Sequence, residues 1–194
     1  MHTLEPSTDP TAPSAVEESR AVARVWRRPL VIGLAALLAV ACVLRYEADA
    51  HGFISAFTAA VLVVLAAIDL QERVIPNRIV VPAAAIVLVA QLAFYPDRAG
   101  EWIVSALGAA LFLFIPAVIK RGAIGMGDVK LAVLLGAATG YAVLPALTFG
   151  FLALVPVAIY MLFREGSAAR KKYLPLGPFL ALGTLVVLLS GAVA

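Results

Sequence analysis

The chain has 194 residues, of which 63% are hydrophobic and 14% charged, with a formal net charge of +3. Its mean hydropathy is +1.00. A soluble domain of this size cannot hide so much apolar surface, because it must cover itself with polar groups. The composition therefore excludes a soluble globular protein, and it equally excludes a disordered or fibrous chain.

Seven apolar stretches follow one another, each close to the roughly 20 residues that a transmembrane helix needs. They cover residues 29–45, 52–70, 77–95, 101–119, 128–144, 145–163 and 174–193. Helices satisfy their own backbone hydrogen bonds in lipid. The sequence therefore predicts an all-α fold, a polytopic transmembrane helical bundle with about seven spans. Six spans are the alternative, because the fifth and sixth stretches are continuous.

The continuous stretch needs a break. One helix over residues 128–163 would be about 54 Å long, which is too long for a hydrocarbon core of roughly 30 Å. Basic residues flank both of its ends, so the chain should return to the side that it left. We therefore predict a tight external turn at the cluster of Gly140, Tyr141 and Pro145.

The basic residues predict the orientation of the bundle. Cytoplasmic loops of membrane proteins carry an excess of Lys and Arg. Of the 15 basic residues, all except Arg45 and Arg98 fall on the side of the N-terminus. This asymmetry predicts a multi-pass protein of the cell inner (plasma) membrane, with its N-terminus in the cytoplasm. Since the positive charge reflects topology, it indicates no nucleic-acid partner.

The first 28 residues differ from the rest of the chain. Residues 1–19 are rich in Pro, Ser, Thr and Glu and poor in large apolar residues, which favours disorder. We predict a disordered cytoplasmic tail over residues 1–28 and a transmembrane domain over residues 29–194. The only cysteine, Cys42, excludes an internal disulfide and a four-cysteine zinc site. Residues 39–42 weakly resemble a lipidation site, but we interpret Cys42 as part of a membrane helix.

Two aspartates stand out, because ionisable residues at membrane depth are functional-site candidates. Asp69 ends the run AVLVVLAAID, and Asp128 lies in GMGDVK at the start of another apolar run. The predicted topology brings both to the cytoplasmic face. Each has a simpler interpretation: Asp128 as a helix N-cap, and Asp69 as the i+4 partner of Arg73.

Two carboxylates at one site suit aspartyl protease chemistry, in which one activates water and the other polarises the scissile carbonyl. The helix macrodipole disfavours an anion at a helix C-terminus and favours one at an N-terminus. This contrast makes Asp128 the base and Asp69 the acid. The mechanism needs neither a metal ion nor a cofactor, and we predict none.

Other residues near the two aspartates have a supporting role in this hypothesis. Gly125 and Gly127 either let the backbone approach a substrate closely or form an ordinary turn. Lys130 supports the site or merely snorkels to the membrane interface. Pro76 and Asn77 indicate a helix that starts after a tight turn.

Three segments resemble a known family. AAIDLQERVIPNRIVVP resembles the first catalytic block of the type 4 prepilin peptidases, and GAIGMGDVKLAVLLGAATG resembles their second, the Gly-x-Gly-Asp segment. YLPLGPFLALG is similar to the characteristic segment at the last helix of that family. The three blocks stand in the family's order, and the resemblance extends over roughly residues 52–190.

The resemblance implies an intramembrane aspartyl endopeptidase that cleaves the leader of prepilins or pilin-like proteins at the cytoplasmic membrane face. It makes Asp69 and Asp128 the catalytic pair, places Gly125, Gly127 and Lys130 in the surrounding motif, and makes residues 29–194 a peptidase domain. The implied partner is a substrate with a hydrophobic N-terminal helix, in a type IV pilus or protein secretion pathway, reached through membrane lipid. The oligomeric state stays open.

Larger members of the family carry an insertion with paired Cys-x-x-Cys motifs and also N-methylate the new pilin terminus. With no cysteine pair here, we predict the peptidase activity alone, as in the compact peptidases that serve Flp-type pili.

Three alternatives remain open. One is another Gly-x-Gly-Asp protease of the presenilin type, although those enzymes use a Tyr-Asp block and Asp69 follows Ile68. Another is a small transporter or proton channel that uses Asp69 and Asp128 as ion sites. A third is a catalytically inactive relative.

Overall fold

The computed structural model describes residues 28–46, 49–119, 124–165 and 175–193, together with Val22 and Arg24. This part of the chain is built from helices and contains no strand. The helices are α2 (Pro29–Arg45), α3 (Ala50–Glu72), α4 (Asn77–Phe94), α5 (Ala99–Ile119), α6 (Met126–Thr139), α7 (Val143–Glu165) and α8 (Gly177–Ser190), with short 3-10 turns η1 (Pro96–Arg98) and η2 (Gly140–Ala142). The predicted helical membrane bundle is thus confirmed.

Four apolar stretches are long enough to cross a membrane by length and composition: Ala50–Glu72, Asn77–Phe94, Pro96–Ile119 and Met126–Arg164. The last of these consists of α6 and α7, which η2 separates. Two further apolar helices, α2 and α8, are shorter. Each of the seven predicted spans therefore corresponds to one helix of the bundle.

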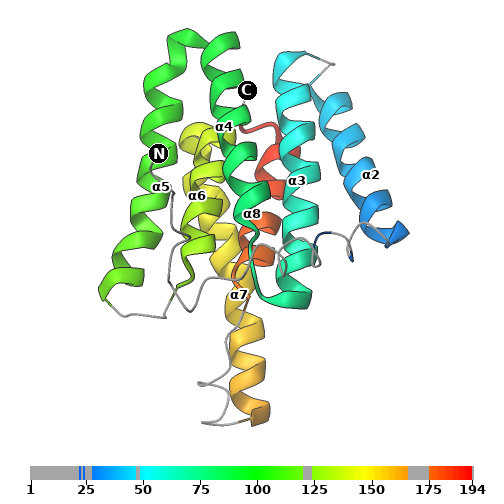
Figure 1. The fold of residues 1–194 in the computed structure, drawn as a ribbon, viewed down its shortest axis with the longest axis vertical. Coiled ribbons are helices and arrows are strands. Elements are labelled where there is room, and N and C mark those ends of the chain that lie inside the picture. Colours follow the sequence, from blue (N-terminus) through cyan, green and yellow to red (C-terminus); the bar gives the residue numbers. More distant parts are fainter. Residues whose placement is uncertain are drawn as a thin grey trace, which may run out of the picture.

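The predicted turn between the fifth and sixth spans is confirmed. α6 ends at Thr139, and Gly140 has a φ of 56°, a conformation that glycine adopts easily. The backbone N–H of Tyr141 donates a hydrogen bond to Oε1 of Glu101, over 3.1 Å, and so ties the turn to α5. Figure 1 shows the chain reversing at this point, with α7 returning along the bundle.

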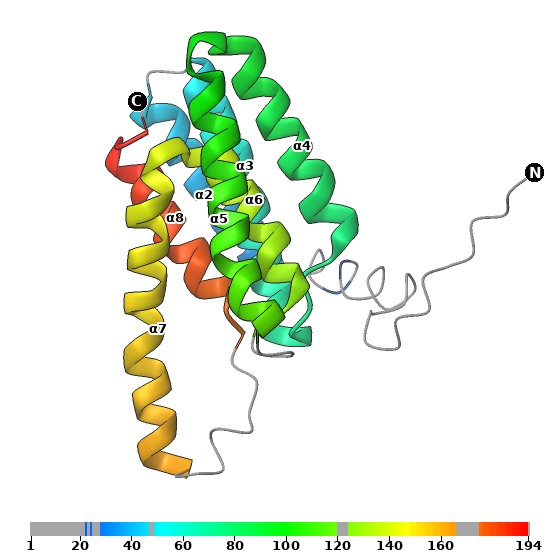
Figure 2. The same cartoon turned by 90° about the vertical axis from the view of Figure 1, so that its left-hand side faces the viewer.

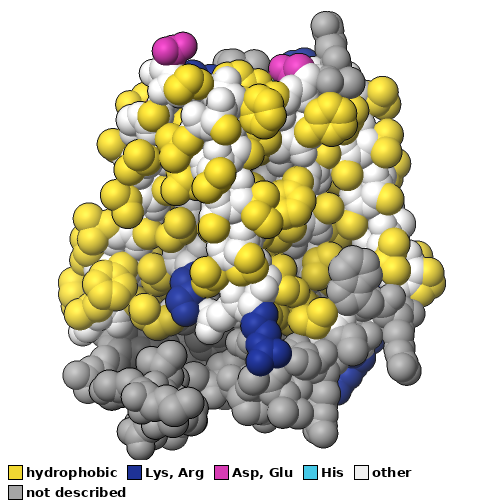
Figure 3. Space-filling view, turned by 45° about the horizontal axis from the view of Figure 1, so that its top comes forward, with side chains coloured by type: hydrophobic (Ala, Val, Ile, Leu, Met, Phe, Trp, Pro, Cys, Tyr) yellow, Lys and Arg dark blue, Asp and Glu magenta, His cyan; other side chains and the backbone are white. Residues whose placement is uncertain are grey.

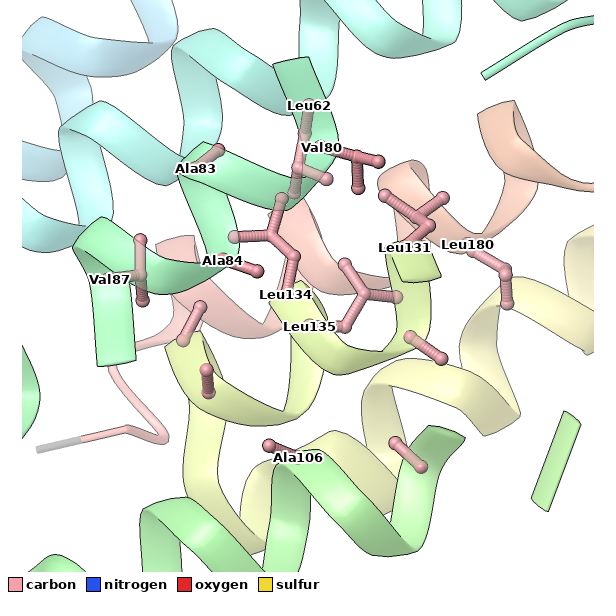
Figure 4. Close-up of a cluster of buried hydrophobic side chains, with 14 of the residues drawn as sticks. Leu62, Val80, Ala83, Ala84, Val87, Ala106, Leu131, Leu134, Leu135 and Leu180 are labelled. Carbon is pink, nitrogen blue, oxygen red and sulfur yellow. The ribbon is translucent and has the colours of Figure 1, made fainter. Parts of the chain in front are cut away.

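The short helix α6 lies inside the bundle, packed against α5 on one side and α4 on the other (Figures 1 and 2). Its sequence is apolar on nearly every face, which is typical of a fully buried helix. Leu131, Leu134 and Leu135 are each at most 1% exposed. Figure 4 shows them among apolar side chains of the neighbouring helices, including Leu62, Val80 and Leu180.

Glycines bring the helix backbones into direct contact. A β-carbon built on Gly136 of α6 would overlap the carbonyl oxygen of Ser105 and lie 2.6 Å from Cα of Ala106. A β-carbon on Gly183 of α8 would lie 2.5 Å from the backbone nitrogen of Gly150 in α7. Small residues at helix contacts are how helices associate without a hydrophobic driving force in lipid. These contacts fix the positions of α6 and α8.

The two ends of the bundle differ in their residues. The end of α3 and the starts of α4, α6 and α8 lie together at the lower end in Figure 1, which we call the Asp69 end. The opposite end, called the Arg98 end, holds η1, η2 and the last residues of the described chain. Hydrophobic side chains cover the face between them, whereas charged side chains gather near its edges (Figure 3). This distribution is that of a multi-pass membrane protein.

A cluster of aromatic and charged side chains stabilises the Arg98 end. Arg98 donates hydrogen bonds of 2.9 and 3.0 Å to the carboxylate of Glu101, and its guanidinium lies 4.8 Å from the ring centre of Trp102. The buried ring of His51 stacks on Tyr95 with a centroid distance of 4.3 Å. This cluster joins α3, η1 and α5 far from the aspartates.

Most of the predicted tail, residues 1–28, lies outside the described residues. Val22 and Arg24 have helical backbone; Val22 packs against Ile68, and Arg24 forms an ion pair with Glu72. Cys42 is a free, fully buried cysteine within α2, as expected for a residue of a membrane helix.

Candidate active site at the Asp69 end

Asp69 lies in the last turn of α3 and is buried, with 3% of its surface exposed. The helix ends at Glu72, and Arg73 follows with a φ of 55°, a left-handed cap whose N–H donates to the carbonyl oxygen of Asp69 over 2.9 Å. The side chain of Asp69 accepts a hydrogen bond of 3.1 Å from the backbone N–H of Gly177. Within the described residues, no ion pair joins Asp69 to Arg73.

Asp128 is the third residue of α6 and is likewise buried, with 4% of its surface exposed. The interpretation of Asp128 as the N-cap is wrong, because Gly125 occupies that position with an extended backbone. The N–H of Asp128 donates to the carbonyl oxygen of Gly125 over 3.0 Å. The carboxylate therefore sits in the first helical turn, where the macrodipole favours an anion.

Ile75 links the two aspartate-bearing helix ends. It belongs to the short connection between α3 and α4 and is 7% exposed. A β-carbon on Gly127, the residue before Asp128, would lie 2.9 Å from Cβ of Ile75. A β-carbon on Gly177, which binds Asp69, would lie 3.3 Å from Cδ1 of the same side chain. The end of α3 and the starts of α6 and α8 therefore meet around one isoleucine.

The other predicted site residues lie at the same end. Pro76 is the N-cap of α4 and Asn77 its first residue, so the predicted helix start is confirmed. The ammonium group of Lys130 donates a hydrogen bond of 2.8 Å to Oδ1 of Asn77. The structure thus brings the motif around Asp128 together with the segment that follows Asp69.

Gly177 is the site residue that the sequence did not single out. It opens α8 within the segment PLGPFLALG, whose similarity to the family's C-terminal block was the only signal for it. Its position also changes the electrostatic argument for Asp69. The amino end of α8 acts on this carboxylate in the opposite sense to the carboxyl end of α3. Helix dipoles alone therefore no longer assign the acid and the base.

The polar groups at this end of the bundle are the two carboxylates, the ammonium group of Lys130 and backbone amides. Within the described residues, no group of three or more His, Cys, Asp or Glu side chains could hold a metal ion. Two carboxylates alone can still perform hydrolysis, because one takes a proton from water while the other donates one.

The fold and the site together define a polytopic helical membrane protein with a pair of buried aspartates at helix ends. The model of the type IV leader peptidase family matches residues 56–162, a segment that contains both aspartates. The chain belongs to this family.

Named relatives agree with this assignment. The chain is 31% identical over 167 residues to a prepilin leader peptidase/N-methyltransferase of Bacillus subtilis, which covers 81% of this chain and 65% of the relative. Enzymes of the same name from Xanthomonas campestris and Pseudomonas putida are each 30% identical, over 84% and 85% of this chain and 58% and 59% of their own length. The chain thus spans about three fifths of the length of these curated relatives. No solved structure gives a significant match.

Proposed function

We propose that the chain is an intramembrane aspartyl endopeptidase that removes the leader peptide from prepilins or pilin-like proteins. The observation that carries the proposal is that the end of α3, which carries Asp69, and the start of α6, which carries Asp128, meet around Ile75, within the segment that the family model matches. We infer that residues 29–194 form the peptidase domain, in the inner membrane, with the site at the cytoplasmic face. The excess of basic residues at this end supports that orientation.

In the proposed mechanism one carboxyl group of the pair is protonated and the other is ionised. The ionised carboxylate accepts a proton from water as the water oxygen attacks the scissile carbonyl. The protonated carboxyl donates a hydrogen bond to the carbonyl oxygen, which becomes negative in the transition state. The amine of the new N-terminus then takes a proton as the C–N bond breaks. The division with Asp128 as base and Asp69 as acid stays a prediction, because the two helix ends at Asp69 act on its carboxylate in opposite senses.

The substrate reaches this site through the bilayer. A prepilin carries a hydrophobic N-terminal helix behind its leader, so it diffuses laterally in lipid and presents the cleavage site near the helix ends. Lys130 and Asn77 lie at the same end of the bundle as the aspartates and are suited to hold the polar segment before that helix. Gly125 keeps the N-cap of α6 free of a side chain where the substrate backbone passes, whereas Gly127 lets Ile75 pack against the start of α6.

The test is co-expression with a prepilin whose leader precedes a hydrophobic helix. Asp69→Asn and Asp128→Asn should each lower cleavage by at least about a hundredfold, the usual scale of a lost acid or base, at unchanged membrane abundance. Asp97→Asn is the matched control, since Asp97 is an exposed carboxylate at the Arg98 end. Normal processing by either aspartate variant would contradict the proposal.

The same preparations separate the alternatives. A transporter would show ion flux in vesicles that depends on Asp69 and Asp128, without any cleavage. An inactive relative would show neither. With S-adenosylmethionine added, we expect the new N-terminus to be released without a methyl group.

A further inference from the structure

Gly177 and Asp69 are 108 positions apart in the sequence, yet the backbone N–H of one donates to the carboxylate of the other within the buried part of the site. We propose that the amino end of α8 positions the carboxylate of Asp69 through the backbone N–H of Gly177. This role requires glycine at position 177. The proposal rests on the function proposed above, because it concerns the rate of that reaction.

The start of α8 leaves this one donor free for the carboxylate. The first N–H groups of a helix have no partner within the helix. At α8, Pro178 has no N–H, and Phe179 and Leu180 both donate to the carbonyl oxygen of Leu176. Leu176, the N-cap, makes no side-chain capping bond. Asp69 therefore takes the place of a capping side chain, supplied by another helix.

This bond fixes the orientation of the carboxylate. With Oδ2 bound to Gly177 N–H at 3.1 Å, rotation of the carboxylate about its Cβ–Cγ bond is restricted. In the proposed mechanism Oδ1 is then the oxygen that carries the proton donated toward the scissile carbonyl. Positioning of this kind matters in catalysis, because a reacting group held in the productive geometry reacts far faster than a mobile one.

Position 177 excludes a side chain for a steric reason. A β-carbon there would lie 2.7 Å from Oδ2 of Asp69 and 3.3 Å from Cδ1 of Ile75. Both neighbours are buried, and Asp69 cannot move without losing the N–H bond. An alanine at this position would therefore push the carboxylate away from its donor while leaving the rest of α8 unchanged.

The far end of α8 holds the helix in register. The hydroxyl of Tyr46 donates to the carbonyl oxygen of Leu188 over 3.0 Å, and Arg45 donates to that of Ser190 over 3.2 Å. Burial raises the pKa of the Tyr46 phenol, which keeps it a neutral donor. Gly183 packs directly on the backbone of α7. α8 is thus anchored along its length, and its first N–H is presented to Asp69 at a fixed place.

The first test compares Gly177→Ala with Gly33→Ala, a glycine of α2 where an added β-carbon meets open space. For purified, folded enzyme in detergent, we expect Gly177→Ala to lower kcat for prepilin cleavage at least tenfold, with KM within twofold. The alkaline limb of its pH–rate profile, which reports Asp69 as the protonated acid, should move to higher pH, because an N–H donor that stabilises the carboxylate has been lost. Gly33→Ala should retain wild-type values. Wild-type kcat and pH profile in folded Gly177→Ala, or a change confined to KM, would overturn the proposal.

The second test does not depend on Gly177→Ala being folded. Labelling with 13C-carbonyl leucine and 15N-glycine selects the four Leu–Gly pairs of the chain for NMR, and loss of one signal in Leu176→Ile assigns Gly177. We expect the Gly177 amide proton to move to higher field in Asp69→Asn and to lose its dependence on pH. An identical signal in wild type and Asp69→Asn would refute the contact. If the wild-type enzyme cleaves no prepilin, the proposed function fails, whereas this measurement still reports on the Gly177–Asp69 bond.

Discussion

Lys130 and Asn77 connect the starts of α6 and α4 by a hydrogen bond of 2.8 Å, although they are 53 positions apart. The bond joins the segment after Asp69 to the motif that contains Asp128. It is exposed, so its energy is that of a screened polar pair, about 0.5–1 kcal/mol. Its value for the reaction would lie in holding the two segments in one arrangement.

A double-mutant cycle with Lys130→Met and Asn77→Ala tests this coupling. We expect each variant to lower kcat/KM for cleavage, and the double variant to lose about two- to fivefold less than the product of the two losses, as 0.5–1 kcal/mol of coupling requires. The cycle cancels the other contacts of each residue. Strictly multiplicative losses would show that the bond does not contribute.

Gly136 is expected to tolerate no side chain at all. Its β-carbon would collide with the backbone of α5 at Ser105 and Ala106, and a backbone cannot rotate away as a side chain can. Overpacking in a tight core costs about 1–3 kcal/mol, which corresponds to a Tm lower by roughly 2–12 °C in a chain of this size. Gly33→Ala is again the matched control. Equal Tm values for Gly136→Ala and Gly33→Ala in detergent would contradict the close approach of α5 and α6.

Glu101 is expected to matter for stability and not for cleavage. Its carboxylate accepts two hydrogen bonds from Arg98 and one from the N–H of Tyr141, and its side chain is only 12% exposed. Glu101→Gln removes the charge that these donors share, at a cost of about 1–3 kcal/mol, or a Tm lower by roughly 2–10 °C. The rate of cleavage well below Tm should stay unchanged, because the cluster is at the Arg98 end. The exposed neighbour variant Asp97→Asn should leave both quantities unaltered.

The orientation of the bundle in the membrane can be measured by chemical labelling of single introduced cysteines. In a Cys42→Ala background, Gln71→Cys lies at the Asp69 end and Asp97→Cys at the Arg98 end, both at exposed positions. We expect a membrane-impermeant maleimide to label Asp97→Cys in intact spheroplasts, and Gln71→Cys only after permeabilisation. The reverse pattern would place the aspartates outside the cell. The wild-type chain is the control, since its buried Cys42 should stay unlabelled until the protein is denatured.

The sequence predicted the helices well, because each is specified by its own residues. α2 has the predicted bounds, and the turn at Gly140 was visible in its glycine and in the basic residues that flank residues 128–163. The central position of α6 is likewise consistent with a segment that is apolar on all faces. Local patterns of this kind need no knowledge of the neighbouring helices.

The contact between Gly177 and Asp69 could not be predicted in the same way. It depends on how α8 packs against α3, and no periodicity in either segment encodes which helix end meets which side chain. The macrodipole argument for Asp69 considered α3 alone for the same reason. The cluster around Arg98 and His51 was also missed, since its residues come from separate helices and turns. The sequence therefore could not predict which residue of another helix each polar side chain contacts.

The C-terminal part of α7 extends beyond the Asp69 end of the other helices, as Figures 1 and 2 both show. Residues 155–163 are apolar, and six of their large side chains are between 38% and 87% exposed. A helical segment of this length covers about 13 Å, and such apolar surface belongs in hydrocarbon. Lipid that covers the end of α7 would therefore extend past the level of the Asp69 end on that side of the bundle. A substrate that approaches along α7 would then meet a locally thicker leaflet, while exposed Gln71 on α3 stays in contact with water.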